Sequence, residues 1–156
     1  MKICYFSKKK ELMHKIIILL LISFLAIKCR QSAVPLNRPD INRIRTDIER
    51  ITNTEKSRNH KNIDILNETA AYIHSELSKY CDTVFYQSFV VDNKEYKNVI
   101  GSVGSQHKER IIIGAHYDVA GEQEGADDNA SGVAGLLESA RILSNEKLGY
   151  RIDFVA

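Results

Sequence analysis

The sequence predicts an α/β domain in which helices surround a mostly parallel mixed sheet, and three observations lead to this prediction. Two stretches between residues 40 and 80 carry apolar residues at spacings of three and four, as helices do. Stretches rich in β-branched and aromatic residues follow. From residue 110 onward, a strand, a helix and a second strand succeed one another, which predicts parallel pairing of the two strands.

Two amphipathic helices are expected first. Asp40 is a suitable N-cap for a helix whose apolar positions are Ile41, Ile44, Ile48 and Ile51. A second helix is expected from about residue 63 to 80. Its apolar face consists of Ile63, Leu66, Ala70, Ile73 and Leu77.

Three strands are expected next, over residues 83–91, 97–103 and 110–116. The first partly alternates, which is typical of a half-exposed strand. The third contains a continuous apolar run from Ile111 to Ala115, which predicts a strand buried on both faces.

A third helix is expected over residues 130–146, followed by a last strand over residues 150–156. The inner stripe of this helix is Val133, Leu136, Leu137, Ala140 and Leu143. All eight glycines lie at or after position 101, and two of them, Gly132 and Gly135, open this helix. Glycine is costly inside a helix, so these two residues suggest close packing of the backbone.

The first 39 residues differ from the rest of the chain. Lysines precede a 12-residue apolar run from Ile16 to Ile27, which predicts a signal peptide over residues 1–29 and an exported protein. Such a run is shorter than the roughly 20 residues that span a membrane. Met1 and Met13 are both suitable starts. Residues 30–39 contain both prolines and are expected to form a linker.

Cys29 stands where a bacterial lipoprotein carries its lipid-modified cysteine, although Lys28 departs from that pattern. The expected location is therefore periplasmic, membrane-anchored through a lipid on Cys29, or secreted. Beyond residue 29 only Cys81 remains, so no internal disulfide framework is expected.

The charge balance does not favour a nucleic-acid partner. Residues 1–29 hold six of the 22 basic residues and one of the 20 acidic residues. The remaining chain therefore has 16 basic and 19 acidic residues, a net charge of −3. The basic character belongs to the targeting segment, and no nucleic-acid-binding surface is expected.

The residues that carry chemistry lie in two short segments, GAHYD (114–118) and GADDNASG (125–132). One follows the third strand and the other opens the third helix, so both are expected at the carboxyl edge of the sheet. One imidazole with carboxylates nearby is a ligand set for catalytic zinc. Asp118, two residues from His116 on an extended strand, could accept a hydrogen bond from the other ring nitrogen.

Each segment alone has an ordinary structural explanation. A His-x-Asp after a strand is usually a strand end, and Asp127, Asp128 and Asn129 alone would usually cap the following helix. Together the segments resemble the M28 metallopeptidases, whose motif is a strand ending in His-x-Asp followed by Gly-Ala-Asp-Asp-Asn-x-Ser-Gly. The YKNVIG strand and the GVAGLLESARIL helix also resemble that family, so the resemblance covers roughly residues 60–156.

The resemblance implies a zinc-exopeptidase-like fold and a function as a zinc-dependent aminopeptidase acting on peptides. It implies that His116 binds one zinc ion and that Asp128 bridges two. Asp118 would be the catalytic carboxylate that orients His116, and Asp127 would be a neighbour rather than a ligand.

The resemblance also leads us to expect a truncated, partial M28 peptidase domain over residues 40–156. The family's general-base glutamate follows the strand that here reads RIDFVA, where the sequence ends. We therefore expect this chain alone to be inactive and its open sheet to favour aggregation. Two alternatives remain: a glutaminyl-peptide cyclotransferase-like enzyme with a single zinc, or a non-catalytic exported fragment. The paired acidic residues favour the two-zinc peptidase. Substrate preference and oligomeric state are not predicted.

Overall fold

The computed structural model describes residues 38–156. The predicted signal peptide, Cys29 and all but the end of the predicted linker lie outside these residues. The elements, in chain order, are α2 (Ile41–Thr52), α3 (Ile63–Leu77), β1 (Thr83–Val91), β2 (Lys94–Val103), β3 (Arg110–Gly114), a short turn η1 (Ala126–Ala130), α4 (Ser131–Leu143) and β4 (Arg151–Val155). Each predicted helix and strand is present, with ends that differ by a few residues.

The four strands form one mixed sheet in the order β1-β2-β4-β3. β3 and β4 are parallel, as their connection through α4 predicts, and they pair from Arg110 opposite Arg151 to Gly114 opposite Val155. The β1–β2 and β2–β4 pairs are antiparallel. The α/β class and the mixed sheet are confirmed, and parallel pairing among residues 38–156 is confined to the strand pair beside the motif segments.

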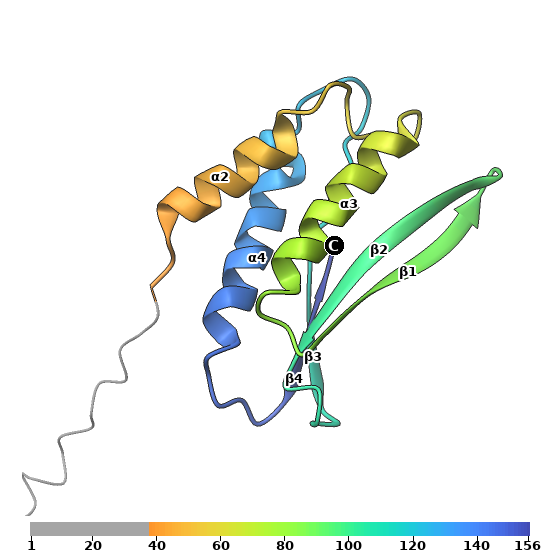
Figure 1. The fold of residues 1–156 in the computed structure, drawn as a ribbon. Helices are drawn as coiled ribbons and strands as arrows, with labels where there is room; N and C mark the ends of the chain where they lie inside the picture. The colour runs from red at the N-terminus through yellow and green to blue at the C-terminus, as the bar shows by residue number, and fades with distance from the viewer. Residues whose placement is uncertain (1–37) are drawn as a thin grey trace, which may run out of the picture. The chain divides into compact units, whose positions relative to one another are not determined.

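β1 and β2 form a long hairpin that extends beyond the helices (Figure 1). Asp92 and Asn93 both have positive φ angles, 50° and 60°, as the two-residue turn of a tight hairpin requires. This turn continues the pairing to Lys94, so β2 begins three residues earlier than the sequence predicts. Because the hairpin projects, β1 is exposed along nearly its whole length rather than half-exposed.

The prediction that the third strand is buried on both faces is wrong. Ile111 is 46% exposed and Ile112 is 63% exposed. β3 is an edge strand of the sheet, and the helices of residues 38–156 pack against only one of its faces. A continuous apolar run therefore shows that neither face of a strand is polar. It does not show that other elements cover both faces.

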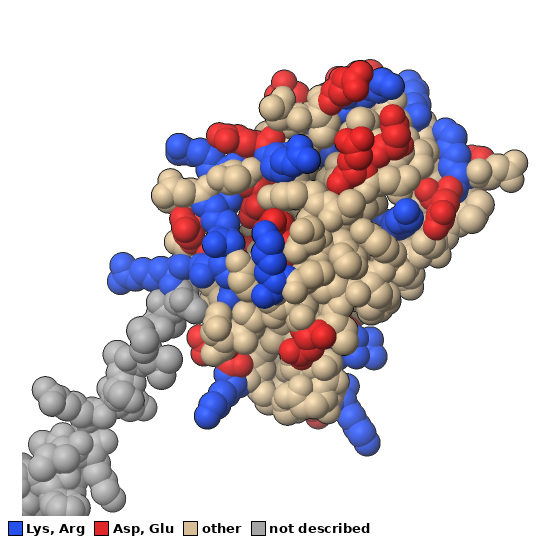
Figure 2. Space-filling model, in the orientation of Figure 1, with Lys and Arg blue, Asp and Glu red and all other residues tan. Residues whose placement is uncertain are grey.

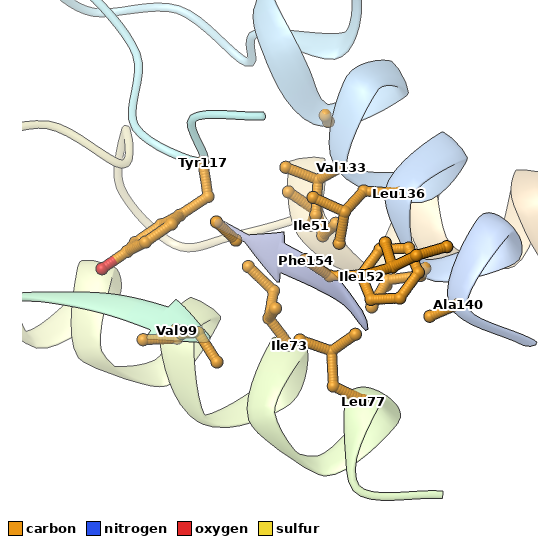
Figure 3. Close-up of a cluster of buried hydrophobic side chains, with 14 of the residues drawn as sticks. Ile51, Ile73, Leu77, Val99, Tyr117, Val133, Leu136, Ala140, Ile152 and Phe154 are labelled. Atoms are coloured by element: carbon orange, nitrogen blue, oxygen red, sulfur yellow. The ribbon is translucent and has the colours of Figure 1, made fainter. Parts of the chain in front are cut away.

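The core lies between the helices and the sheet (Figure 3). α3 contributes Ile73 and Leu77, α4 contributes Val133 and Leu136, and β4 contributes Phe154, all at most 2% exposed. Gly101 of β2 lets α3 approach closely, since a Cβ there would lie 2.8 Å from Cys81 Sγ and 3.2 Å from Leu77 Cδ1. The predicted apolar faces of α3 and α4 are confirmed as the buried faces.

Ile41 is the exception among the predicted apolar positions of the helices, being 67% exposed. It occupies the first turn of α2, before that helix reaches the core. Asp40 caps this helix as predicted, because its side chain accepts hydrogen bonds from the backbone N–H groups of Asn42 and Arg43.

Acidic and basic side chains are interspersed over the face shown in Figure 2. Among the helices of residues 38–156, none combines the length and the apolar character that crossing a bilayer requires.

Candidate metal centre

The segment that carries His116 and Asp118 is fixed by Tyr117 between them. The Tyr117 side chain is buried at the margin of the core cluster (Figure 3), is 9% exposed, and its hydroxyl donates a hydrogen bond to the Lys97 carbonyl at 2.6 Å. Burial raises the pKa of Tyr117 to about 12, so the phenol stays neutral and keeps donating. Because Tyr117 faces inward, its two neighbours are left at the exposed side.

His116 lies between two carboxylates. Its Nδ1 is 3.2 Å from Asp118 Oδ1 and 3.2 Å from the Asp118 carbonyl oxygen. Its Nε2 is 3.1 Å from Asp128 Oδ1. The structure thus brings together His116 and Asp118 of the first motif segment and Asp128 of the second.

The arrangement of hydrogen-bond donors around this ring has a chemical consequence. A neutral imidazole has one N–H, and if Nδ1 donates to Asp118, the Nε2 lone pair faces the Asp128 carboxylate. Two electron-rich atoms at 3.1 Å repel unless a positive charge lies between them. That charge can be a second ring proton or a metal ion.

Asp128 lies in the turn η1. The backbone angles of Asp128 and Asn129 in this turn are not helical. Gly125 begins the turn with a positive φ of 64°, and a Cβ there would lie 2.1 Å from Val119 Cγ1. The Asn129 side chain accepts a hydrogen bond from the Gly132 N–H at 3.2 Å and so holds the turn to the start of α4. Asp128 is thereby held beside the His116 ring.

His116 and Asp128 fit part of a zinc site. Zinc bonds of roughly 2.0–2.1 Å in a tetrahedral shell place two donor atoms about 3.3 Å apart, close to the 3.1 Å between Nε2 and Oδ1. Asp118 faces the opposite ring nitrogen, the usual place for a group that orients a histidine ligand. Within residues 38–156, no three His, Cys, Asp or Glu side chains converge on one metal position. The described residues would therefore supply two donors and a group that orients one of them.

The remaining acidic residues of the motif region do not join these three. Asp127 is exposed, and its carbonyl accepts a hydrogen bond from the Ser131 hydroxyl. Glu122 lies 3.6 Å from Lys61, and Glu124 contributes its carbonyl to Arg58.

Sequence reasoning did not single out Arg58 and Asn59, which are both 0% exposed. Asn59 donates to the Gly121 carbonyl at 2.7 Å, and the Arg58 carbonyl accepts from the Val119 N–H at 2.8 Å. These residues hold the loop that connects the two motif segments. Arg58 and Asn59 are polar residues in the connection between two predicted helices. The apolar periodicity of the sequence therefore does not indicate that they are buried.

A pocket of about 210 Å³ opens beside the site. Its lining joins His116 and Asp118 to Phe89 and Tyr96 of the hairpin and to His60. The rings of Phe89 and Tyr96 stack with centroids 5.8 Å apart. The pocket lining thus combines an aromatic pair with one candidate metal ligand, His116, and with Asp118.

Comparison with solved structures defines the class of fold. The Porphyromonas gingivalis glutaminyl cyclase superposes with a TM-score of 0.62 at 26% identity, covering 75% of this chain and 44% of that one. A Zn-dependent exopeptidase from Parabacteroides distasonis gives a TM-score of 0.62 at 22% identity, covering 77% and 47%. The fold is that of the zinc exopeptidases and glutaminyl cyclases.

Sequence comparison then gives a family match. Residues 98–156 match the model of peptidase family M28. The uncharacterized protein YfbL of Escherichia coli is 40% identical over 114 residues, which are 68% of this chain and 35% of that protein. Aminopeptidase YwaD of Bacillus subtilis is 34% identical over 67 residues, 41% of this chain and 15% of that protein. The chain thus spans about a third of YfbL and less of YwaD.

Proposed function

We propose that this chain provides the first part of the metal centre of a zinc-dependent aminopeptidase that removes amino-terminal residues from peptides. The observation that carries the proposal is the position of His116, with one ring nitrogen against Asp118 and the other 3.1 Å from Asp128. The match of residues 98–156 to peptidase family M28 and the similarity to aminopeptidase YwaD support the same activity.

Each of the three side chains has a separate task in this proposal. His116 and Asp128 would hold zinc, Asp128 would also serve a second ion, and Asp118 would keep the His116 ring turned toward the metal. Bound zinc would polarise the peptide carbonyl and favour ionisation of water. The pocket beside His116 would admit the end of a peptide, with the aromatic pair of Phe89 and Tyr96 excluding water from one side.

The proposal is tested with aminoacyl anilide substrates, measuring release of the chromogenic amine. The chain is assayed with zinc and with chelator, beside its His116 and Asp128 variants. We expect any amine release to depend on zinc and to stop with chelator. His116→Ala and Asp128→Ala should lower kcat/KM by a factor on the order of 1,000, because each removes a ligand of the metal that promotes the reaction. Equal activity of these variants and the parent would exclude the proposed centre.

A second candidate function is that of a glutaminyl cyclase, which the similarity to the Porphyromonas gingivalis enzyme favours. The same assays therefore include a peptide with amino-terminal glutamine, whose cyclisation releases ammonia. Ammonia release without amine release from the anilides would establish the cyclase function instead. If neither substrate reacts, the third alternative, a non-catalytic exported fragment, is favoured.

A further inference from the structure

We infer that Arg58 is a positioning residue that sets the separation of His116 and Asp128, an inference that rests on the proposed metal centre. Arg58 lies far before both residues in the sequence and outside both motif segments. Its guanidinium nevertheless contacts the backbone of both motif segments.

The guanidinium of Arg58 donates hydrogen bonds to backbone carbonyls of both motif segments. Nε donates to the Tyr117 carbonyl at 3.0 Å, in the peptide between His116 and Asp118. Nη1 donates to the Glu124 carbonyl at 2.7 Å, and Nη2 to the Gly125 carbonyl at 3.2 Å, directly before the turn that carries Asp128. One rigid planar group therefore joins the two segments, and a change at either contact alters the distance between them.

The fourth contact ties this group to the rest of the fold. Nη1 also donates to the Ile51 carbonyl at 2.8 Å, near the end of α2. Ile51 is itself a core residue, 1% exposed. Through Arg58, both motif segments are thus connected to a helix that packs in the core.

Arg58 is a buried charged residue that has no carboxylate partner in the described part of the chain. All four acceptors are neutral carbonyls, and Arg58 takes part in none of the ion pairs among residues 38–156. Burial lowers the pKa of Arg58, and the Asp118 carboxylate opposes this effect from a greater distance. A fully buried charge is costly. The four hydrogen bonds that the forked guanidinium donates at the junction of the two segments offset this cost.

The test uses the 156-residue chain and Co²⁺ alone as the probe. Paramagnetic broadening of NMR signals detects metal binding even when it is weak, as it should be with two protein ligands. Arg58→Lys keeps the charge but lacks the planar fork, and we expect it to lower Co²⁺ affinity about 10–100-fold, the usual effect of losing an outer-sphere partner. Hydrogen exchange of the Val119 amide, which donates to the Arg58 carbonyl, should become faster in the same variant.

The matched control is Arg141→Ala. Arg141 is also a well-bonded arginine, but it lies near the end of α4 and contacts Glu138 and the Arg38 carbonyl. Its loss should lower the free energy of unfolding while Co²⁺ affinity and Val119 exchange stay as in the parent chain. A purely structural role of Arg58 would leave the Co²⁺ affinity of both variants equal to that of the parent chain, whatever happens to Val119 exchange.

Two further variants separate the possible outcomes. Asn59→Ala keeps Arg58 and loosens only the Gly121 end of the loop, so it should lower Co²⁺ affinity by less than Arg58→Lys does. Unchanged Co²⁺ affinity in whichever of these variants fold overturns the inference. If His116→Ala also binds Co²⁺ like the parent, the proposed metal centre itself is wrong, whereas a loss in His116→Ala alone leaves that centre standing and removes only the role of Arg58.

Discussion

At the scale of single residues, the two glycines at the start of α4 have different roles. A Cβ on Gly132 would lie 2.2 Å from Asn129 Oδ1, the atom that accepts the Gly132 N–H, while a Cβ on Gly135 would meet nothing within 4 Å. The sequence suggests close packing at both positions, and the structure shows it only at Gly132. The motif around Asp128 therefore includes a glycine that is needed because a neighbouring side chain occupies its space.

We predict that Gly132→Ala lowers the free energy of unfolding by about 1–3 kcal/mol, because it displaces the Asn129 cap and crowds the turn. Gly135→Ala should raise that free energy by up to about 1 kcal/mol, since alanine is the better helix former. Urea denaturation of both variants measures the difference. Equal shifts of the two midpoints would mean that Asn129 moves aside without cost.

At the scale of secondary structure elements, a carboxylate links the start of α2 to α4. Glu138, 3% exposed, accepts hydrogen bonds from the Asp40 N–H at 2.6 Å and from Arg141. The Arg141 hydrogen bond is the main reason that the pKa of Glu138 lies below its ordinary value of 4.5. The two helices are thus joined by a polar contact at one end and by core packing at the other.

We predict that Glu138→Gln lowers the free energy of unfolding by about 2–3 kcal/mol at neutral pH, the usual size of a hydrogen bond to a charged group. Because the folded pKa is lowered, the ionised carboxylate stabilises the fold above pH 4.5. That contribution is lost as the pH falls through the folded pKa. The difference between Glu138→Gln and the parent should therefore shrink on acidification below pH 4.5 in denaturation curves. A constant difference at all pH values would contradict this explanation.

Most of the helices and strands and the three candidate site residues could be predicted from the sequence. What could not be predicted has a physical cause. The apolar periodicity of residues 63–77 identifies α3 and its buried face, because burial and helical spacing act on the same residues. The sequence also brings His116, Asp118 and Asp128 together at one sheet edge, as the structure does. Burial of Arg58 depends instead on carbonyl groups far along the chain, and every residue has a carbonyl, so no local pattern records it.

At the scale of the whole molecule, one side of the sheet is uncovered within residues 38–156. Ile112 is 63% exposed on the edge strand β3, and Phe85 is 45% exposed on the opposite edge strand β1. Exposed apolar strands at a sheet edge are templates for pairing with another chain. Asp153 interrupts the apolar character on β4, where it is buried against Ser102 and Arg151.

We predict that the chain self-associates at rising concentration and that Ile112→Lys raises the concentration needed by a factor on the order of ten, since burying an isoleucine contributes about 1.5–3 kcal/mol. Sedimentation velocity measures this concentration. Ile41→Lys is the control, because Ile41 is equally exposed but stands on the first turn of α2. Similar behaviour of both variants would place the association elsewhere.

The contacts of Arg58 have one more consequence, which concerns the boundaries of a functional unit. The family match begins at residue 98 and includes His116, Asp118 and Asp128. The guanidinium that joins their segments comes from a residue 40 positions earlier, in a connection between two helices that the family match does not include. A polypeptide cut at the limits of the recognisable motif would carry every candidate ligand and would have lost the scaffold that spaces them. The recognisable part of this sequence is therefore smaller than the part that builds the site.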